Sequence, residues 1–101
     1  MLVNINDSSL NVTASSTPTA YALPEGTYRV RVVNKSGDLL VLKGETSSSV
    51  TLVAPTIGTM YKGSTMVDSS VEVFDVSPGI THISIYSTGS GTVGLQFTYG
   101  Q

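Results

Sequence analysis

The chain has 101 residues, which is the size of one domain with a single thin core rather than of two ordinary domains. Its five Lys and Arg residues are too few to build a phosphate-binding face for nucleic acid, and the formal net charge is only −2. The absence of cysteine excludes disulfides and thiolate metal sites. No apolar run approaches the ~20 residues of a membrane helix, and the first residues lack a signal-peptide pattern, so we expect synthesis in the cytoplasm and no membrane partner.

Residues 1–20 combine Ser, Thr and Asn with scattered apolar positions. This composition predicts either one or two weak strands or an extended arm that becomes ordered only against a neighbour. We therefore divide the chain into this segment and a β-sandwich domain over residues 21–101. If the segment is an arm, deleting residues 1–15 should abolish binding to a partner and leave the β fold intact.

From residue 27 onward a period of two residues recurs, which is typical of half-buried strands. In the first of these strands Tyr28, Val30 and Val32 share one face, and Tyr99 lies on the apolar face of the last. We expect Tyr28 and Tyr99 in the core or at its rim. The predicted strands cover residues 27–32, 39–43, 50–53, 71–76, 80–86 and 93–99, and strand 71–76 has apolar residues on both faces.

Turn residues separate these strands, notably Pro24-Glu25-Gly26, Ser77-Pro78-Gly79 and the run of residues 88–92. Short strands, separated by turns at intervals of about 8–12 residues, predict an all-β chain folded as an antiparallel β-sandwich. The pattern does not distinguish immunoglobulin-like, jelly-roll and tulip-like arrangements. Residues 55–70 read as a long loop with a short strand around Met60-Tyr61-Lys62, and long loops in small domains are often functional.

Catalytic signatures are absent from the sequence. His82, the only histidine, is expected on the outer face of a strand with Ser84 and Tyr86, opposite two isoleucines. No nucleophile elbow, metal-binding pattern or calcium loop accompanies it. Three carboxylates are expected in or beside turns, where they accept hydrogen bonds from backbone amides or face solvent: Glu25, Asp38 and Glu45. We therefore predict no enzymatic activity, no catalytic or metal-binding residue and no cofactor.

Two sequons, Asn11-Val12-Thr13 and Asn34-Lys35-Ser36, match the acceptor pattern for N-glycosylation. A chain rich in Ser and Thr produces such matches by chance. Since no secretion signal precedes them, we interpret both as coincidental.

Two segments carry a resemblance to a known class of proteins. The run Leu23-Pro24-Glu25-Gly26-Thr27-Tyr28-Arg29-Val30-Arg31-Val32 resembles the entry strand of β-sandwich modules in phage virion proteins, and the run of residues 88–93 before the last strand is similar in the same way. In size and composition the chain is similar to the small capsid decoration (cement) proteins of tailed phages. The resemblance implies a homotrimer or monomer that sits on an icosahedral shell and braces neighbouring major capsid subunits.

We therefore expect a non-enzymatic structural protein of the virion, a capsid decoration protein made in the host cytoplasm. Its partners would be the major capsid protein or another virion protein, and copies of itself, with a trimer favoured. The alternative is a carbohydrate- or receptor-binding module of a phage tail or fibre, with exposed tyrosines as contacts. Candidate interface residues are the apolar side chains of segments 1–20 and 55–70: Leu2, Val3, Ile5, Leu10, Val12, Ile57, Met60, Tyr61 and Met66.

Overall fold

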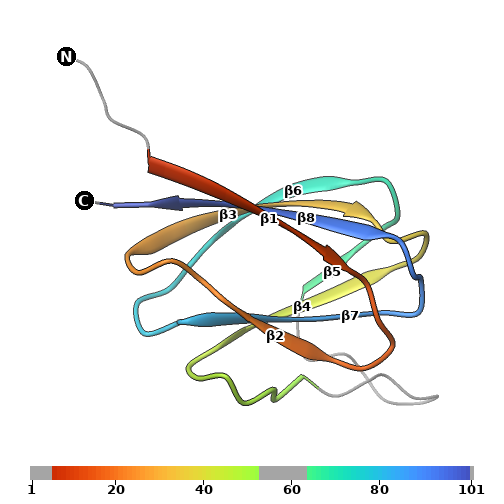
Figure 1. Cartoon of the computed structure of the whole chain (residues 1–101), viewed down its shortest axis with the longest axis horizontal. Helices are drawn as coiled ribbons and strands as arrows, with labels where there is room; N and C mark the ends of the chain where they lie inside the picture. Colours follow the sequence, from red (N-terminus) through yellow and green to blue (C-terminus); the bar gives the residue numbers. More distant parts are fainter. Residues whose placement is uncertain (1–5, 53–63, 101) are drawn as a thin grey trace.

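The structure, a computed structural model, describes residues 6–52 and 64–100 (Figure 1). These residues form eight strands and no helix, which confirms the all-β prediction. The strands are β1 Asn6–Thr13, β2 Thr19–Ala22, β3 Thr27–Lys35, β4 Leu40–Glu45, β5 Ser64–Met66, β6 Val71–Asp75, β7 His82–Ser87 and β8 Thr92–Tyr99.

Two four-stranded antiparallel sheets face each other and form a sandwich (Figure 1). Sheet A has the order β1-β8-β3-β6, and sheet B has the order β2-β7-β4-β5. The chain changes sheet at every connection except the one between β4 and β5. Eight strands interleaved in this way make a jelly roll, so the strand order selects one of the three arrangements that the sequence pattern allows.

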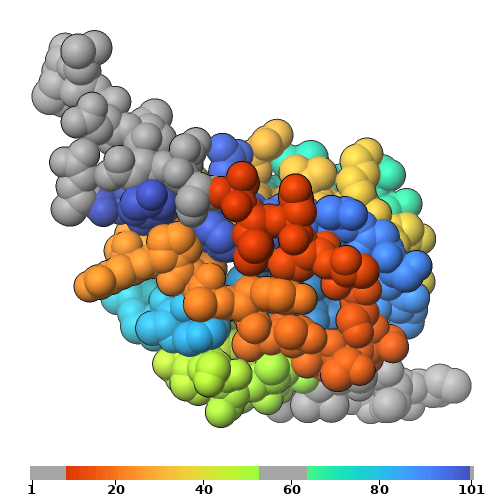
Figure 2. All heavy atoms as spheres, in the orientation of Figure 1, coloured from red at the N-terminus to blue at the C-terminus, as the bar shows by residue number. Residues whose placement is uncertain are grey.

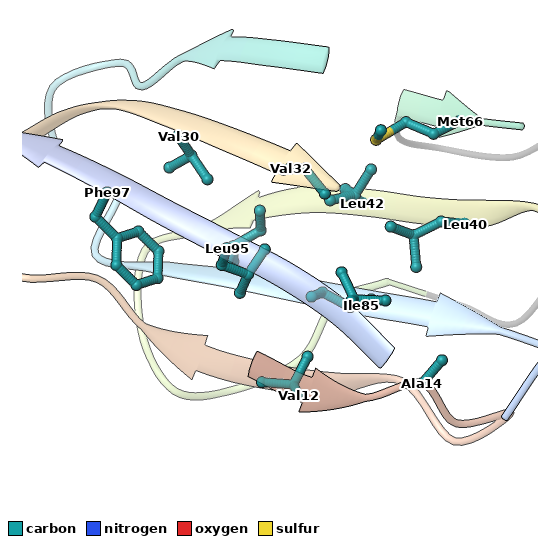
Figure 3. Packing of buried hydrophobic residues seen from close by; sticks show 12 residues of the cluster. Val12, Ala14, Val30, Val32, Leu40, Leu42, Met66, Ile85, Leu95 and Phe97 are labelled. Carbon is teal, nitrogen blue, oxygen red and sulfur yellow. The ribbon is translucent and has the colours of Figure 1, made fainter. Parts of the chain in front are cut away.

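The core lies between the inner faces of the two sheets. Val32, Leu95 and Phe97 project from sheet A toward Leu42 and Ile85 of sheet B (Figure 3). In β8 the buried positions alternate strictly with less buried ones, as expected for a strand with one face in the core. The other core side chains are Val12, Ala14, Val30, Leu40, Met66, Ile83 and Val93.

One predicted core tyrosine lies outside the core. Tyr28 is 48% exposed, because the register of β3 against β8 shifts between Thr27 and Arg29 and leaves Tyr28 as the extra residue of a β-bulge. The prediction that Tyr28 shares the buried face of Val30 is therefore wrong at the start of the strand. Tyr99 packs against the core, as predicted.

The amino-terminal segment belongs to the sandwich as far as it is described. β1 pairs with β8 over all eight of its residues, and β2 pairs with β7. A boundary at residue 20 therefore does not separate two structural units, and residues 1–5 lie outside the described part. Deleting residues 1–15 would remove β1 and the core side chains Val12 and Ala14, so the structure favours loss of the fold over the intact fold expected from the sequence.

The segment after β4 also differs from the expectation. Residues 50–52 form no strand, although the sequence predicts one over residues 50–53. Leu52 is nevertheless buried there. Within the predicted loop of residues 55–70, β5 occupies Ser64–Met66, whereas the expected strand around Met60-Tyr61-Lys62 lies outside the described residues.

A buried amide holds together one end of the sandwich. Asn34 is fully buried, and its Nδ2 donates to the carbonyl oxygens of Asp38 at 3.0 Å, Met66 at 3.3 Å and Val67 at 3.0 Å. Its Oδ1 accepts from the backbone N–H and the hydroxyl of Ser36, at 3.0 and 2.6 Å. One side chain thereby satisfies polar groups of the β3–β4 and β5–β6 connections.

The β7–β8 connection packs tightly against the same end. A Cβ atom on Gly89 would overlap the carbonyl oxygen of Ser36, and one on Gly91 would overlap the carbonyl oxygen of Lys35. Gly91 also donates its N–H to the Ser36 carbonyl at 2.9 Å. The two glycines therefore allow close backbone contact at this connection between the two sheets.

We expect Gly91→Ala and Gly89→Ala to lower the free energy of unfolding by about 1–3 kcal/mol or more, because each methyl group must displace a packed backbone. Urea denaturation followed by circular dichroism measures this as a lower midpoint with an unchanged slope. Gly100→Ala is the control, since no heavy atom lies within 4 Å of its added Cβ. Equal stability of all three variants would contradict the packing described here.

Candidate functional site

His82 lies on the outer face of sheet B, as predicted. It shares this face with Ser84 and Tyr86, whereas Ile83 and Ile85 point into the core. The His82 Nδ1 atom lies 2.8 Å from the hydroxyl of the neighbouring Thr81.

Beside His82, the outer face of sheet B carries a sheltered carboxylate. Glu45 is 3% exposed and pairs in register with His82. It accepts hydrogen bonds from the Thr51 N–H at 2.8 Å, the Thr51 hydroxyl at 2.6 Å and the Ser84 hydroxyl at 2.7 Å. The Lys43 Nζ donates to the Thr51 hydroxyl at 2.6 Å. Glu45 thus holds the segment that follows β4 in place at Thr51. This agrees with the prediction that Glu45 accepts a hydrogen bond from a backbone amide beside a turn.

This row of polar side chains has the geometry of a structural clamp rather than of a catalytic triad. The hydroxyl of Ser84 is buried and donates to Glu45, so it is not directed at His82 as a nucleophile would be. Burial raises the pKa of Glu45, but hydrogen bonds from Thr51 and Ser84 and the charge of Lys43 outweigh it and leave the pKa below its ordinary value. A general acid at neutral pH needs a raised pKa instead.

The clamp should make stability depend on pH. Since the pKa of Glu45 is lower in the folded chain, its contribution is complete above the ordinary pKa of 4.5 and is lost as the pH falls through the folded value. We expect Glu45→Gln to cost about 1–2 kcal/mol of unfolding free energy at pH 7 and progressively less toward pH 3.

Urea denaturation of both proteins between pH 3 and 8 measures this difference. Asp75→Asn is the control, because the Asp75 carboxylate is exposed and such groups contribute little. If the loss of unfolding free energy in Glu45→Gln stays constant across this pH range, the ionised form of the Glu45 carboxylate does not provide the stabilisation.

A groove with an apolar floor opens between β4 and β6. We call it the β4–β6 groove; it has a volume of about 330 Å³. In the part of the chain that the structure describes, β5 pairs with residues Leu40–Leu42 of β4 and does not extend along the edge of β4 from Lys43 onward. The apolar lining is Leu23, Val30, Leu42, Phe74, Val76, Ile80 and Ile83, and the polar lining includes Lys43, Asp75, Ser77 and His82.

The other face of β6 is apolar as well. Val71 and Val73 are 48% and 55% exposed and lie on the outer face of sheet A; we call this pair the β6 surface. β6 is an edge strand, since it pairs only with β3. The ion pair between Arg29 and Asp75, with the guanidinium Nε 3.4 Å from the carboxylate, lies beside this pair on the same strands. Exposed valines that adjoin on an edge strand are typical of a contact surface.

The predicted interface residues are only partly available to a partner. Leu10 is 39% exposed on β1. Val12 and Met66 are buried in the core, where Val12 pairs with Val93 and Met66 with Leu40, so assigning them to an interface is wrong. The remaining candidates lie outside the described residues: Leu2, Val3, Ile5, Ile57, Met60 and Tyr61.

Val71 and Val73 are exposed apolar side chains that the sequence pattern did not single out as candidate contacts. The available signal was the strand 71–76 itself, whose apolar residues on both faces exceed what one core requires. The sequence gives no signal for the structural role of Asn34, because a sequon is typical of a surface position whereas this side chain is buried. Its amide nitrogen, the atom that a glycan would modify, is buried and hydrogen-bonded in the folded chain.

Residues 6–52 and 64–100 also bear on three other kinds of site: a metal site, a membrane-spanning helix and a sugar-binding surface. No three His, Cys, Asp or Glu side chains gather there to hold a metal ion, and no helix in these ranges is long and apolar enough to cross a membrane. Among the tyrosines described, Tyr28 is exposed, whereas Tyr21, Tyr86 and Tyr99 are partly buried. They do not form an exposed platform of several rings for a sugar.

Comparison with known proteins supports the fold. No family model matches the sequence, and no curated protein matches it either. The chain is similar to a solved structure of Bacillus endospore appendages, described as forming a novel family of disulfide-linked pili, with a TM-score of 0.55 and 16% sequence identity. The match covers 96% of this chain and 88% of that chain. At this identity it bears on the fold alone, and the present sequence contains no cysteine for a disulfide.

Proposed function

We propose that this chain is a non-enzymatic structural protein whose copies associate into a larger assembly. The observation that carries the proposal is that β6 presents apolar side chains on both faces, beside its two acidic residues. Val71 and Val73 are exposed on its outer face, and Phe74 lines the β4–β6 groove on its inner side. An edge strand with this pattern buries apolar area when a second copy contacts it.

Composition and fold add support to self-association. Charged residues make up only 12% of the chain, so copies packed closely together repel one another weakly. The similar Bacillus structure belongs to appendages described as pili, which are assemblies of repeated subunits. Because this sequence lacks cysteine, contacts between its copies would not include disulfides. We expect its assemblies to dissolve in denaturant without a reducing agent.

The setting of the assembly has two proposed forms. In the first, the chain polymerises by itself into an appendage-like filament. In the second, it is a phage capsid decoration protein, located on the virion as a homotrimer or monomer that braces the major capsid protein. Electron microscopy of the purified chain separates them, because the first form gives filaments without any scaffold. The second gives small oligomers that sediment with particles only when capsids are added.

The β6 surface provides a direct test of self-association. We expect Val73→Glu to weaken association of the chain by roughly ten- to a hundredfold, since a buried valine contributes about 1.5–3 kcal/mol. Sedimentation velocity over a range of protein concentrations measures the change. Val50→Glu is the matched control, because Val50 is also partly exposed but lies in the segment after β4.

Circular dichroism verifies that both variants remain folded. A wild-type chain that stays monomeric at every concentration and binds no particle would refute a structural role. Association that Val73→Glu leaves unchanged would remove the β6 surface from the proposal.

A further inference from the structure

β1 presents an unpaired edge to solvent. It is the terminal strand of sheet A, and within residues 6–52 and 64–100 it pairs only with β8. The strand lies on the front surface of the molecule in Figure 2. Its residues Ser9, Asn11 and Thr13 are exposed.

The register shows which backbone groups lie at this edge. In an antiparallel ladder the N–H and C=O groups of one residue point to the same side, and the sides alternate along the strand. Ala14 donates its N–H to the carbonyl of Gly91, in the same register as β1 and β8. Leu10 and Val12 therefore turn their backbone groups toward β8. Ser9, Asn11 and Thr13 turn theirs toward solvent.

The backbone edges of the other three terminal strands carry features that discourage strand pairing with another chain, whereas the β6 surface is a sheet face and not such an edge. β5 has three residues, and β2 has four residues that lie between Pro18 and Pro24. β6 has five residues, two of them acidic, and Glu72 lies opposite the buried Val32 on the inner side of the sheet. Short length, flanking proline and inward charge are the devices by which proteins protect sheet edges.

β1 lacks these devices. It is eight residues long, and its pairing with β8 runs without a register shift. Residues 8–13 contain no charge and no proline. Leu10 faces the inner side of the sheet opposite Leu95, yet it is 39% exposed, so the sandwich leaves part of this side chain uncovered at the β1 edge.

A second copy of β1 fits this edge. Two identical strands related by a two-fold axis pair antiparallel, and the uncharged residues 8–13 bring no like charges into opposition. On the outer face the hydroxyl and amide side chains of Ser9, Asn11 and Thr13 would lie across from one another. On the inner face Leu10 would gain cover from the partner strand.

We propose that two copies of this chain pair through β1, antiparallel, so that two copies of sheet A join into one continuous eight-stranded sheet. The inference deepens the proposed function and rests on it, since it names one surface through which copies associate. β1 and β6 lie on opposite edges of sheet A, so pairing through β1 leaves the β6 surface free for a second contact. Two separate contact surfaces are what a subunit needs to build beyond a dimer.

A cysteine scan tests the pairing directly, because the chain contains no cysteine of its own. Ser9→Cys, Leu10→Cys and Asn11→Cys are made singly, and each is treated with a short thiol crosslinker. A two-fold axis places one residue directly opposite its copy, and each step along the strand separates the two copies of a residue by a further ~7 Å. We expect one of the three variants to crosslink to dimer well above the others and above Ser48→Cys, an exposed control outside β1.

Asn11→Pro tests the hydrogen bonds at the edge. It removes an N–H that points to solvent and not one that bonds β8, so circular dichroism should remain that of the wild type. We expect the dimer dissociation constant to rise roughly tenfold or more relative to Asn11→Ala, which loses the same side chain but keeps the N–H. Sedimentation equilibrium measures both constants.

The outcomes separate this inference from the proposed function. Association of the wild-type chain without a crosslinking maximum in β1, or with equal constants for a folded Asn11→Pro and Asn11→Ala, overturns pairing through β1 and leaves self-association intact. A chain that is monomeric at all concentrations overturns pairing through β1, and it overturns the proposed function as well if the chain also binds no particle. If Asn11→Pro unfolds, the cysteine scan alone decides.

Discussion

The hydrogen bonds of the Asn34 side chain are the interaction on which the jelly-roll topology depends most. A chain that changes sheet at nearly every connection must bury some loop backbone, and buried carbonyl groups without a partner cost about 1–3 kcal/mol each. At one end of the sandwich the amide of Asn34 binds three such carbonyls, and the Ser36 hydroxyl accepts a further bond from Ser87 at 3.1 Å. The β3–β4, β5–β6 and β7–β8 connections are thereby tied to one another.

The two ends of the sandwich differ in character as a result. The Asn34 end is closed by polar contacts and close backbone packing at Gly89 and Gly91. Toward the other end β5 stops short of covering β4, and the β4–β6 groove remains open with an apolar floor. Close backbone packing thus marks one end, whereas exposed apolar side chains lie on the edge strands of sheet A and the apolar groove lies toward the other end. This division suits a subunit that must fold first and associate afterwards.

The sequence predicts the elements whose signal is local. Alternation identifies β3, β7 and β8, and the turn residues separate them correctly. The alternation predicts a core position for Tyr28 and is wrong there, because a β-bulge depends on how β3 pairs with β8 and not on either strand alone. The pattern of residues 50–53 predicts a strand, because the sequence does not reveal the hydrogen bond from the Thr51 N–H to the Glu45 carboxylate. The interface prediction fails at Val12 and Met66, since their burial arises from pairing with residues far away in the sequence. The apolar residues on both faces of β6 were visible in the sequence, but their meaning required the strand to be placed at an edge.

The pairing of β1 with β8 brings the beginning and the end of the described chain together. Asn6 lies opposite Tyr99 in the ladder, and Gly100 donates its N–H to the carbonyl of Gly26 nearby. A short linker between these two strands would therefore close the backbone into a ring without disturbing either sheet. New ends opened in the exposed segment 46–50 would then give a circular permutant in which every strand keeps its neighbours. The strand order along the polypeptide is in this sense cyclic, and the sandwich fixes only which strands lie next to which.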